Sequence, residues 1–148
     1  MNVHLIFKSF GKRIKFCAIF FLAVITFSCV EVLAQNHEWV SVFTGASSIQ
    51  ANAITVDASG NVYTTGVFAG TADFDPGAGE VSLTSAGNND IFITKLNASG
   101  ALVWARKVGG TGADEGLAIR VDASSNVLVS GKFTSTVDFD PGAGTSNL

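Results

Sequence analysis

Cysteine is almost absent from this sequence, and its two cysteines, Cys17 and Cys29, both lie near the amino terminus. From position 35 onward the chain therefore has neither disulfide bonds nor thiolate chemistry. Basic residues are also scarce, because nine Lys and Arg stand against twelve Asp and Glu in 148 residues. Nucleic-acid binding needs basic patches that displace counterions, so this balance argues against a nucleic-acid partner.

The first 34 residues differ in composition from the rest of the chain. Four of the nine bases precede the apolar run Phe16–Val30, and a small residue, Ala34, ends the segment. A basic start, a short apolar centre and a small residue at the cut predict a signal peptide over 1–34, and hence a secreted or cell-surface protein. Its removal would leave five bases against eleven acids, a net charge of about −6.

Two other interpretations of this segment were weighed. A membrane anchor requires about 20 apolar residues, and the apolar run is shorter, so no membrane partner is expected after cleavage. A lipoprotein with lipid on Cys29 would have an aliphatic residue three positions earlier, where Thr26 stands. A cleaved leader fits the residues better than either alternative.

The only two prolines, Pro76 and Pro141, belong to one repeated stretch. Asp73–Gly79 reads Asp-Phe-Asp-Pro-Gly-Ala-Gly and returns unchanged 65 residues later as Asp138–Gly144. An ungapped alignment at this offset gives 21 identities in 45 positions. A fixed period is the signature of a repeat protein. It predicts repeats over 35–148, with one unit at 39–103 and a partial second unit at 104–148.

Short β-branched and aromatic segments come in pairs joined by tight turns. Ala53–Val56 and Val62–Thr65 flank Asp57–Gly60, and the pattern recurs around Asn97–Gly100. Asp and Asn can accept a hydrogen bond from the backbone two residues on, and Gly takes a positive φ, so each pair predicts a hairpin. In the second unit Ser125 replaces the turn glycine, at a cost on the order of 1 kcal/mol.

One unit thus holds two hairpins, and the chain is expected to have seven strands with a short extra one at Val81–Thr84. The glycine-rich segments Gly66–Gly79 and Gly109–Gly116 are predicted to be connections. Apolar residues alternate on both faces of Ile91–Leu96, which indicates a sheet covered on both sides. The fold class is therefore all-β, with four-stranded antiparallel β-propeller blades.

The stretch Val56–Gly66 resembles the core motif of the bacterial seven-bladed β-propeller repeat, the SBBP repeat. The extension Phe74–Gly79 is similar to versions in large secreted bacterial proteins. The resemblance implies an extracellular propeller, and the family has no common catalytic residues to transfer. Ser125 and Leu128 depart from the motif's Gly and Tyr in the second unit.

Seven strands are fewer than the sixteen or so that four blades require. The count predicts an incomplete propeller of about 1.5 to 2 blades, the N-terminal part of a longer protein whose remaining blades are its first partners. The alternative is a short natural protein that assembles.

The repeated stretch also carries the candidate metal ligands, Asp73, Asp75, Asp138 and Asp140. Closely spaced carboxylates suit Ca²⁺, but the third acid or amide and the distant Glu of an EF-hand loop are missing. The same residues make a turn, in which Pro presets φ, Gly77 supplies a positive φ and Asp75 bonds the backbone. We expect a structural turn with Phe74 and Phe139 as buried aromatic residues, and Ca²⁺ as the one cofactor hypothesis.

Other candidates for chemistry are few. Trp39 and Trp104 could be sugar platforms, but their fixed repeat positions favour a place in the blade core. His37 has no repeat partner, and the adjacent acids Asp114 and Glu115 are expected to be solvated in a loop. No catalytic residue is assigned. The sequence favours a non-enzymatic scaffold or surface-interaction module that binds an extracellular protein or glycan. Two alternatives stay open: part of a polysaccharide lyase or glycosidase, and a carbohydrate-binding lectin.

Overall fold

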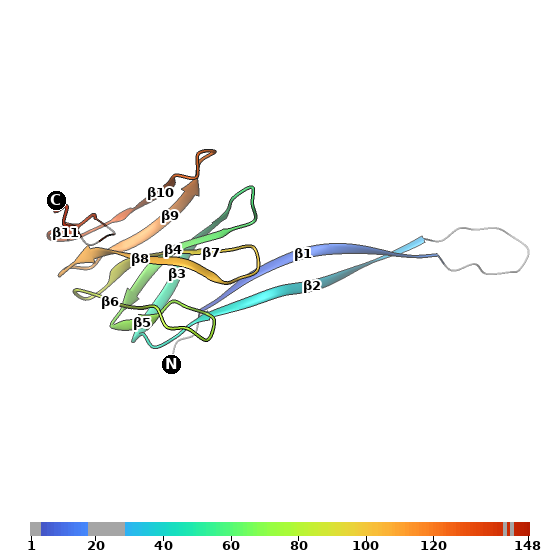
Figure 1. The fold of residues 1–148 in the computed structure, drawn as a ribbon, viewed down its shortest axis with the longest axis horizontal. Helices are drawn as coiled ribbons and strands as arrows, with labels where there is room; N and C mark the ends of the chain where they lie inside the picture. The colour runs from blue at the N-terminus through green and yellow to red at the C-terminus, as the bar shows by residue number, and fades with distance from the viewer. Residues whose placement is uncertain (1–3, 18–28, 141, 143) are drawn as a thin grey trace, which may run out of the picture. The chain divides into compact units, whose positions relative to one another are not determined.

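The structure is a computed structural model that describes residues 4–17, 29–140, 142 and 144–148, with side chains from Trp39 onward. The described part is built from strands alone, as the sequence predicts (Figure 1). The strands are β1 (His4–Cys17), β2 (Cys29–Phe43), β3 (Ser48–Val56), β4 (Val62–Ala69), β5 (Thr71–Asp73), β6 (Ser82–Thr84), β7 (Asp90–Leu96), β8 (Leu102–Gly110), β9 (Glu115–Val121), β10 (Val127–Lys132) and β11 (Val137–Asp138).

The chain divides into two compact units. Phe7–Val40 forms one, in which β1 pairs with β2, and Ser41–Leu148 with the first six residues forms the other. Part of the predicted apolar leader, residues 18–28, lies outside the described residues, and the signal peptide stays a prediction. Among the described residues no helix is long and apolar enough to cross a membrane.

The first repeat unit forms one antiparallel blade. Its sheet has the order β11-β8-β7-β4-β3, so the two predicted hairpins lie side by side as four sequential strands. Within the link from β4 to β7, β5 pairs with β6, which confirms the short strand expected near Val81. The two-residue strand β11, from the second unit, pairs with the outer strand β8.

The second hairpin, β9–β10, packs against one face of this blade. The ladder of β9 and β10 is separate from the five-stranded sheet, and β9 contacts β3 and β4. The side-chain amide of Asn52 donates to Glu115 Oε1 at 3.1 Å and to the carbonyl oxygen of Gly116 at 2.9 Å. The blade is therefore covered on this face by the next unit, which supports the prediction made from its two apolar faces.

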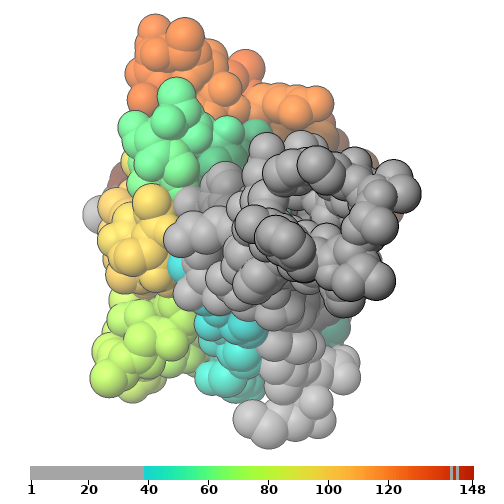
Figure 2. Space-filling model, turned by 90° about the vertical axis from the view of Figure 1, so that its right-hand side faces the viewer, coloured from blue at the N-terminus to red at the C-terminus, as the bar shows by residue number. Residues whose placement is uncertain are grey.

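The hairpin turns share one geometry. In the first turn the Asp57 carboxylate accepts the backbone N–H groups of Ser59 and Asn61 at 2.9 Å, and Gly60 has φ +80°. The turns at Asn97 and Asp122 repeat these bonds. Ser125 has φ +67°, which confirms that a serine takes the glycine conformation. The three turns emerge on the same side of the sheets (Figure 2).

The predicted connections at Gly66–Gly79 and Gly109–Gly116 are wrong in part, because β4 continues to Ala69 and β8 to Gly110. Glycine is present within β4 for a packing reason. A Cβ on Gly66 would overlap the Gln50 carbonyl oxygen, where a bulge between Ala51 and Ala53 brings the backbone of β3 close. A strand interior can hold glycine where another backbone approaches closely, so its presence does not mark a loop here.

Candidate functional site

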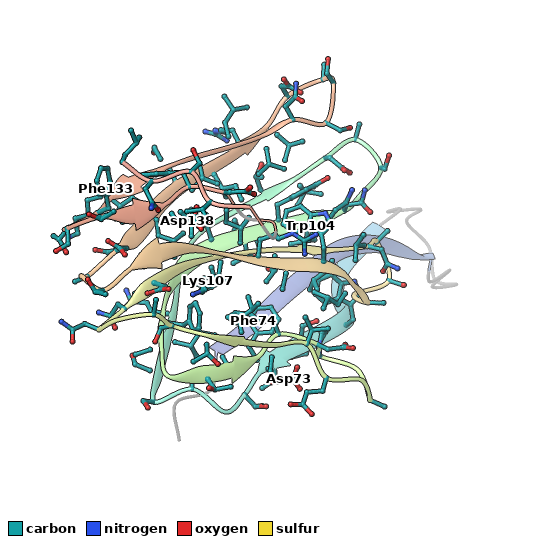
Figure 3. All side chains as sticks on the ribbon, turned by 60° about the vertical axis from the view of Figure 1, so that its left-hand side comes forward. Asp73, Phe74, Trp104, Lys107, Phe133 and Asp138 are labelled. Atoms are coloured by element: carbon teal, nitrogen blue, oxygen red, sulfur yellow. The ribbon has the colours of Figure 1, made fainter. Side chains whose placement is uncertain are left out.

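The repeated Asp-Phe-Asp loop follows β5 in the first unit and β11 in the second. Asp73 Oδ1 accepts the N–H groups of Asp75 and Val81 at 2.9 Å, and Asp75 Oδ1 accepts that of Gly77 at 2.8 Å (Figure 3). The second loop repeats all three bonds through Asp138 and Asp140, at 2.7 to 3.0 Å. The expected turn is thus present twice, and its acids bind their own backbone.

The glycines of this loop serve a purpose that differs from the predicted one. Gly77 does not have a positive φ, so that part of the prediction is wrong. A Cβ at Gly77 would stand 3.0 Å from Asp75 Oδ1, and one at Gly79 would overlap Asp75 Oδ2. Glycine is needed because the chain folds closely around the Asp75 carboxylate, and Gly144 stands in the same relation to Asp140.

Each loop also pairs with the strand that precedes the hairpins of its own unit. The backbone of Asp73 exchanges two hydrogen bonds with Thr44, at 2.8 and 3.2 Å, directly after β2. At the same offset, Asp138 pairs with Gly109 in β8. The loop therefore links consecutive units by main-chain hydrogen bonds, a role that its sequence alone did not reveal.

The two loop phenylalanines differ in burial. Phe74 is fully buried, with ring centroids of Phe43, Phe68 and Phe92 within 5.1 to 5.3 Å of its own. Phe139 is 36% exposed and has Phe133 at 5.2 Å. The expectation of two buried rings is confirmed for Phe74 and wrong for Phe139. The reason is that the described residues place no strand beside β10 to cover the second ring.

The four metal candidates are distributed as two pairs, one in each loop. In each pair the two Oδ1 atoms already accept backbone N–H groups, which also lowers the pKa of Asp138 through Ser146 and Asp140. The described part of the chain has no group of three or more His, Cys, Asp or Glu that could hold a metal ion. Each loop offers two carboxylates at most, and Ca²⁺ binding stays a prediction.

The acids Asp114 and Glu115 are not solvated, contrary to the sequence interpretation. Asp114 is 1% exposed, and its carboxylate accepts the N–H groups of Gly110 at 2.8 Å and Thr134 at 3.0 Å. Glu115 begins β9 and pairs with Lys132 at 2.8 Å, which lowers the pKa of Glu115. Both acids join neighbouring segments, so they are not a free pair for acid–base chemistry.

A buried ion pair escaped the sequence reasoning. Asp90, at the start of β7, is fully buried, and its Oδ2 lies 3.3 Å from Lys107 Nζ and accepts the N–H of Ala86 at 3.0 Å. Asp90 Oδ1 has no partner. Position 90 has no counterpart in either repeat copy within this sequence, so the period could not identify it.

The tryptophans lie nearer the surface than expected. Trp39 and Trp104 are both half-buried, and Trp104 meets the buried ring of Tyr63 edge-on at 6.2 Å. Their place in the blade core is therefore only partial. The side chain of His37 lies outside the described side chains.

A cavity of about 230 Å³ lies between β8 and the second Asp-Phe-Asp loop. Arg106 and Lys107 line it together with Asp138 and Asp140, so two cations face two carboxylates. Because the charges balance and the two Oδ1 atoms are engaged, the cavity has no net field to select a simple ion.

Comparisons with known proteins agree with a propeller repeat. Residues 38–67 match the family model described as Beta-propeller repeat, SBBP. A protein of Acanthamoeba polyphaga mimivirus described as an uncharacterized WD repeat-containing protein is 26% identical over 110 residues, covering 65% of this chain. The chain spans 8% of the length of that relative. No solved structure matches. These likenesses support β-propeller repeats arranged as antiparallel sheets.

Proposed function

We propose that the chain is a secreted, non-enzymatic β-propeller repeat segment that acts as a scaffold or surface-interaction module. The observation that supports it best is the use of its carboxylates. Those of Asp57, Asp114 and Asp122 and of both Asp-Phe-Asp loops accept N–H groups of the chain itself. Repeated acids that hold turns and join units form a frame for other molecules rather than a reaction centre.

Secretion is tested by expressing the chain with its own first 34 residues in a bacterial host. We expect the shortened chain in the medium or on the cell surface, measured by fractionation and by protease treatment of intact cells. The matched control begins at Gln35 and should remain inside. Retention of the full-length chain in the cytoplasm would contradict the proposed location.

The scaffold role is tested against the two alternatives with the exported protein. A lyase or glycosidase would release new chain ends from a polysaccharide panel, measured by reducing-end assay. A lectin would bind defined sugars on a glycan array. We expect neither signal, and reproducible product release would replace the scaffold proposal with an enzymatic one.

A further inference from the structure

The strand β10 has one free edge in the described part of the chain. Its counterpart in the first unit, β4, pairs with β3 on one side and with β7 on the other. By the 65-residue offset β10 corresponds to β4 and β9 to β3, and the ladder of β10 contains only β9. The edge that β7 occupies on β4 is therefore open on β10.

The first unit shows what fills this place. Phe92 of β7 lies directly opposite Gly66 of β4, and its ring is fully buried. Its centroid is 5.1 Å from that of Phe74 and 6.2 Å from that of Phe43. Because Gly66 has no side chain, the aromatic ring of the neighbouring strand can lie over the backbone of β4.

The same environment is already assembled beside β10. Phe133 and Phe139 meet at 5.2 Å and 82°, as their counterparts Phe68 and Phe74 meet at 5.3 Å and 88°. Yet Phe133 is 47% exposed and Phe139 36%, whereas both counterparts are fully buried. The pair keeps its geometry without its cover.

An apolar cavity of about 210 Å³ opens at this place. Gly131, Phe133, Phe139 and Val108 line it, and they correspond to the residues around Phe92, namely Gly66, Phe68, Phe74 and Phe43. Ile91 and Ile93 of the first blade close its other side. An apolar cavity of about 150 Å³ can hold benzene, so the volume is sufficient for a phenyl ring.

We propose that this cavity, the aromatic socket, receives the aromatic side chain of an extended strand that adds antiparallel to the free edge of β10. The occupant is a β7-type strand from another repeat unit, with its ring opposite Gly131 and an acid opposite Phe133, as Asp90 is opposite Phe68. Main-chain bonds to β10 supply affinity, and the socket selects the side chain. The inference rests on the proposed scaffold role, since it names the partner through which repeat units assemble.

The probe is a labelled synthetic peptide of sequence Asp-Ile-Phe-Ile-Thr-Lys-Leu, that of β7, added to the intact chain and followed by fluorescence anisotropy. We expect saturable binding that weakens at least tenfold when the peptide's Phe is replaced by Ala. Phe139→Ala in the protein should weaken binding to a similar extent. The matched control is Leu128→Ala, because Leu128 is 56% exposed and lies on the opposite face of β10.

Equal binding of the Phe and Ala peptides would overturn the socket, as would binding that Phe139→Ala leaves unchanged. Dimers of the chain that exclude the peptide would show that a second copy occupies the edge instead, which also contradicts the proposal. Since the peptide comparison needs no protein variant, it stands even if Phe139→Ala fails to fold. Failure here would leave the scaffold role intact, whereas polysaccharide cleavage would remove that role without changing the peptide result.

Discussion

Lys107 extends its ammonium group to within 3.3 Å of the fully buried carboxylate of Asp90, and no other charged group neutralises this acid at salt-bridge distance in the described residues (Figure 3). Lys107 itself is 32% exposed. A buried carboxylate is tolerated because a cation and a backbone N–H compensate for its lost hydration. The pair joins β7 and β8, the two outer strands of the blade.

Replacing Lys107 by Met should destabilise the chain by roughly 3 kcal/mol, because it leaves Asp90 charged and unpaired in the interior. We expect the double variant Lys107→Met with Asp90→Asn to recover part of this loss, since the buried charge is then gone. Urea denaturation followed by circular dichroism measures both. A Lys107→Met protein as stable as the parent would show that the pair is not important.

Replacing Ser125 by Gly should stabilise the chain by about 0.5 to 1 kcal/mol, because φ +67° strains a residue with a Cβ. The exposed turn makes no other demand on this side chain. Ser124→Gly is the matched control, as Ser124 has no positive φ and gains only unfolded-state freedom. The two variants should shift the thermal midpoint in opposite directions, and a shift in the same direction would contradict the strain argument.

The turn acids make stability depend on pH below neutrality. The pKa of Asp122 is lowered by the Asn126 side-chain amide and then by backbone N–H groups. Since the folded pKa lies below the unfolded value, the stabilisation is complete above about pH 5 and is lost as pH falls through the folded pKa.

Asp122→Asn tests this pH dependence. The turn at Asn97 shows that an Asn side chain supports the same backbone bonds, at 3.0 Å. We therefore expect a folded variant whose stability falls less steeply between about pH 5 and pH 2, measured by denaturant titration at each pH. An unchanged slope would mean that Asp122 does not contribute to the acid transition.

Calcium should produce no saturable heat when titrated into the purified chain in a calorimeter. The Oδ1 atoms of Asp73, Asp75, Asp138 and Asp140 are engaged by backbone N–H groups, and two carboxylates per loop fall short of the 6–8 oxygens that Ca²⁺ takes. Saturable heat that disappears in Asp75→Asn with Asp140→Asn would establish calcium sites in the loops. Magnesium serves as the control cation.

Much of the fold could be predicted from the sequence because its determinants are local. Each hairpin is specified by a few adjacent residues, an Asp or Asn followed by a positive-φ position, and the structure confirms all three turns and the order of the four strands. The Asp-Phe-Asp turn is local in the same way. Its glycines were misinterpreted only because Gly66 and Gly77 meet atoms that a turn rule does not consider.

Pairings between distant segments could not be predicted in this way. Asp114 appeared solvated because its buried partners come from β8 and from Thr134, twenty residues away. Asp90 was overlooked because a period identifies only residues that have a repeat counterpart. The link from Asp138 to β8 depends on how one unit stacks on the next.

The sequence by itself determined the period, the hairpins and the all-β class, since these depend on spacing and backbone preference within a few residues. The tertiary structure alone decided burial, which depends on what covers a side chain. Phe74 and Phe139 stand in identical seven-residue stretches, yet one is enclosed by β7 and the other is open. The same residues thus form a finished core in one unit and an aromatic socket in the other.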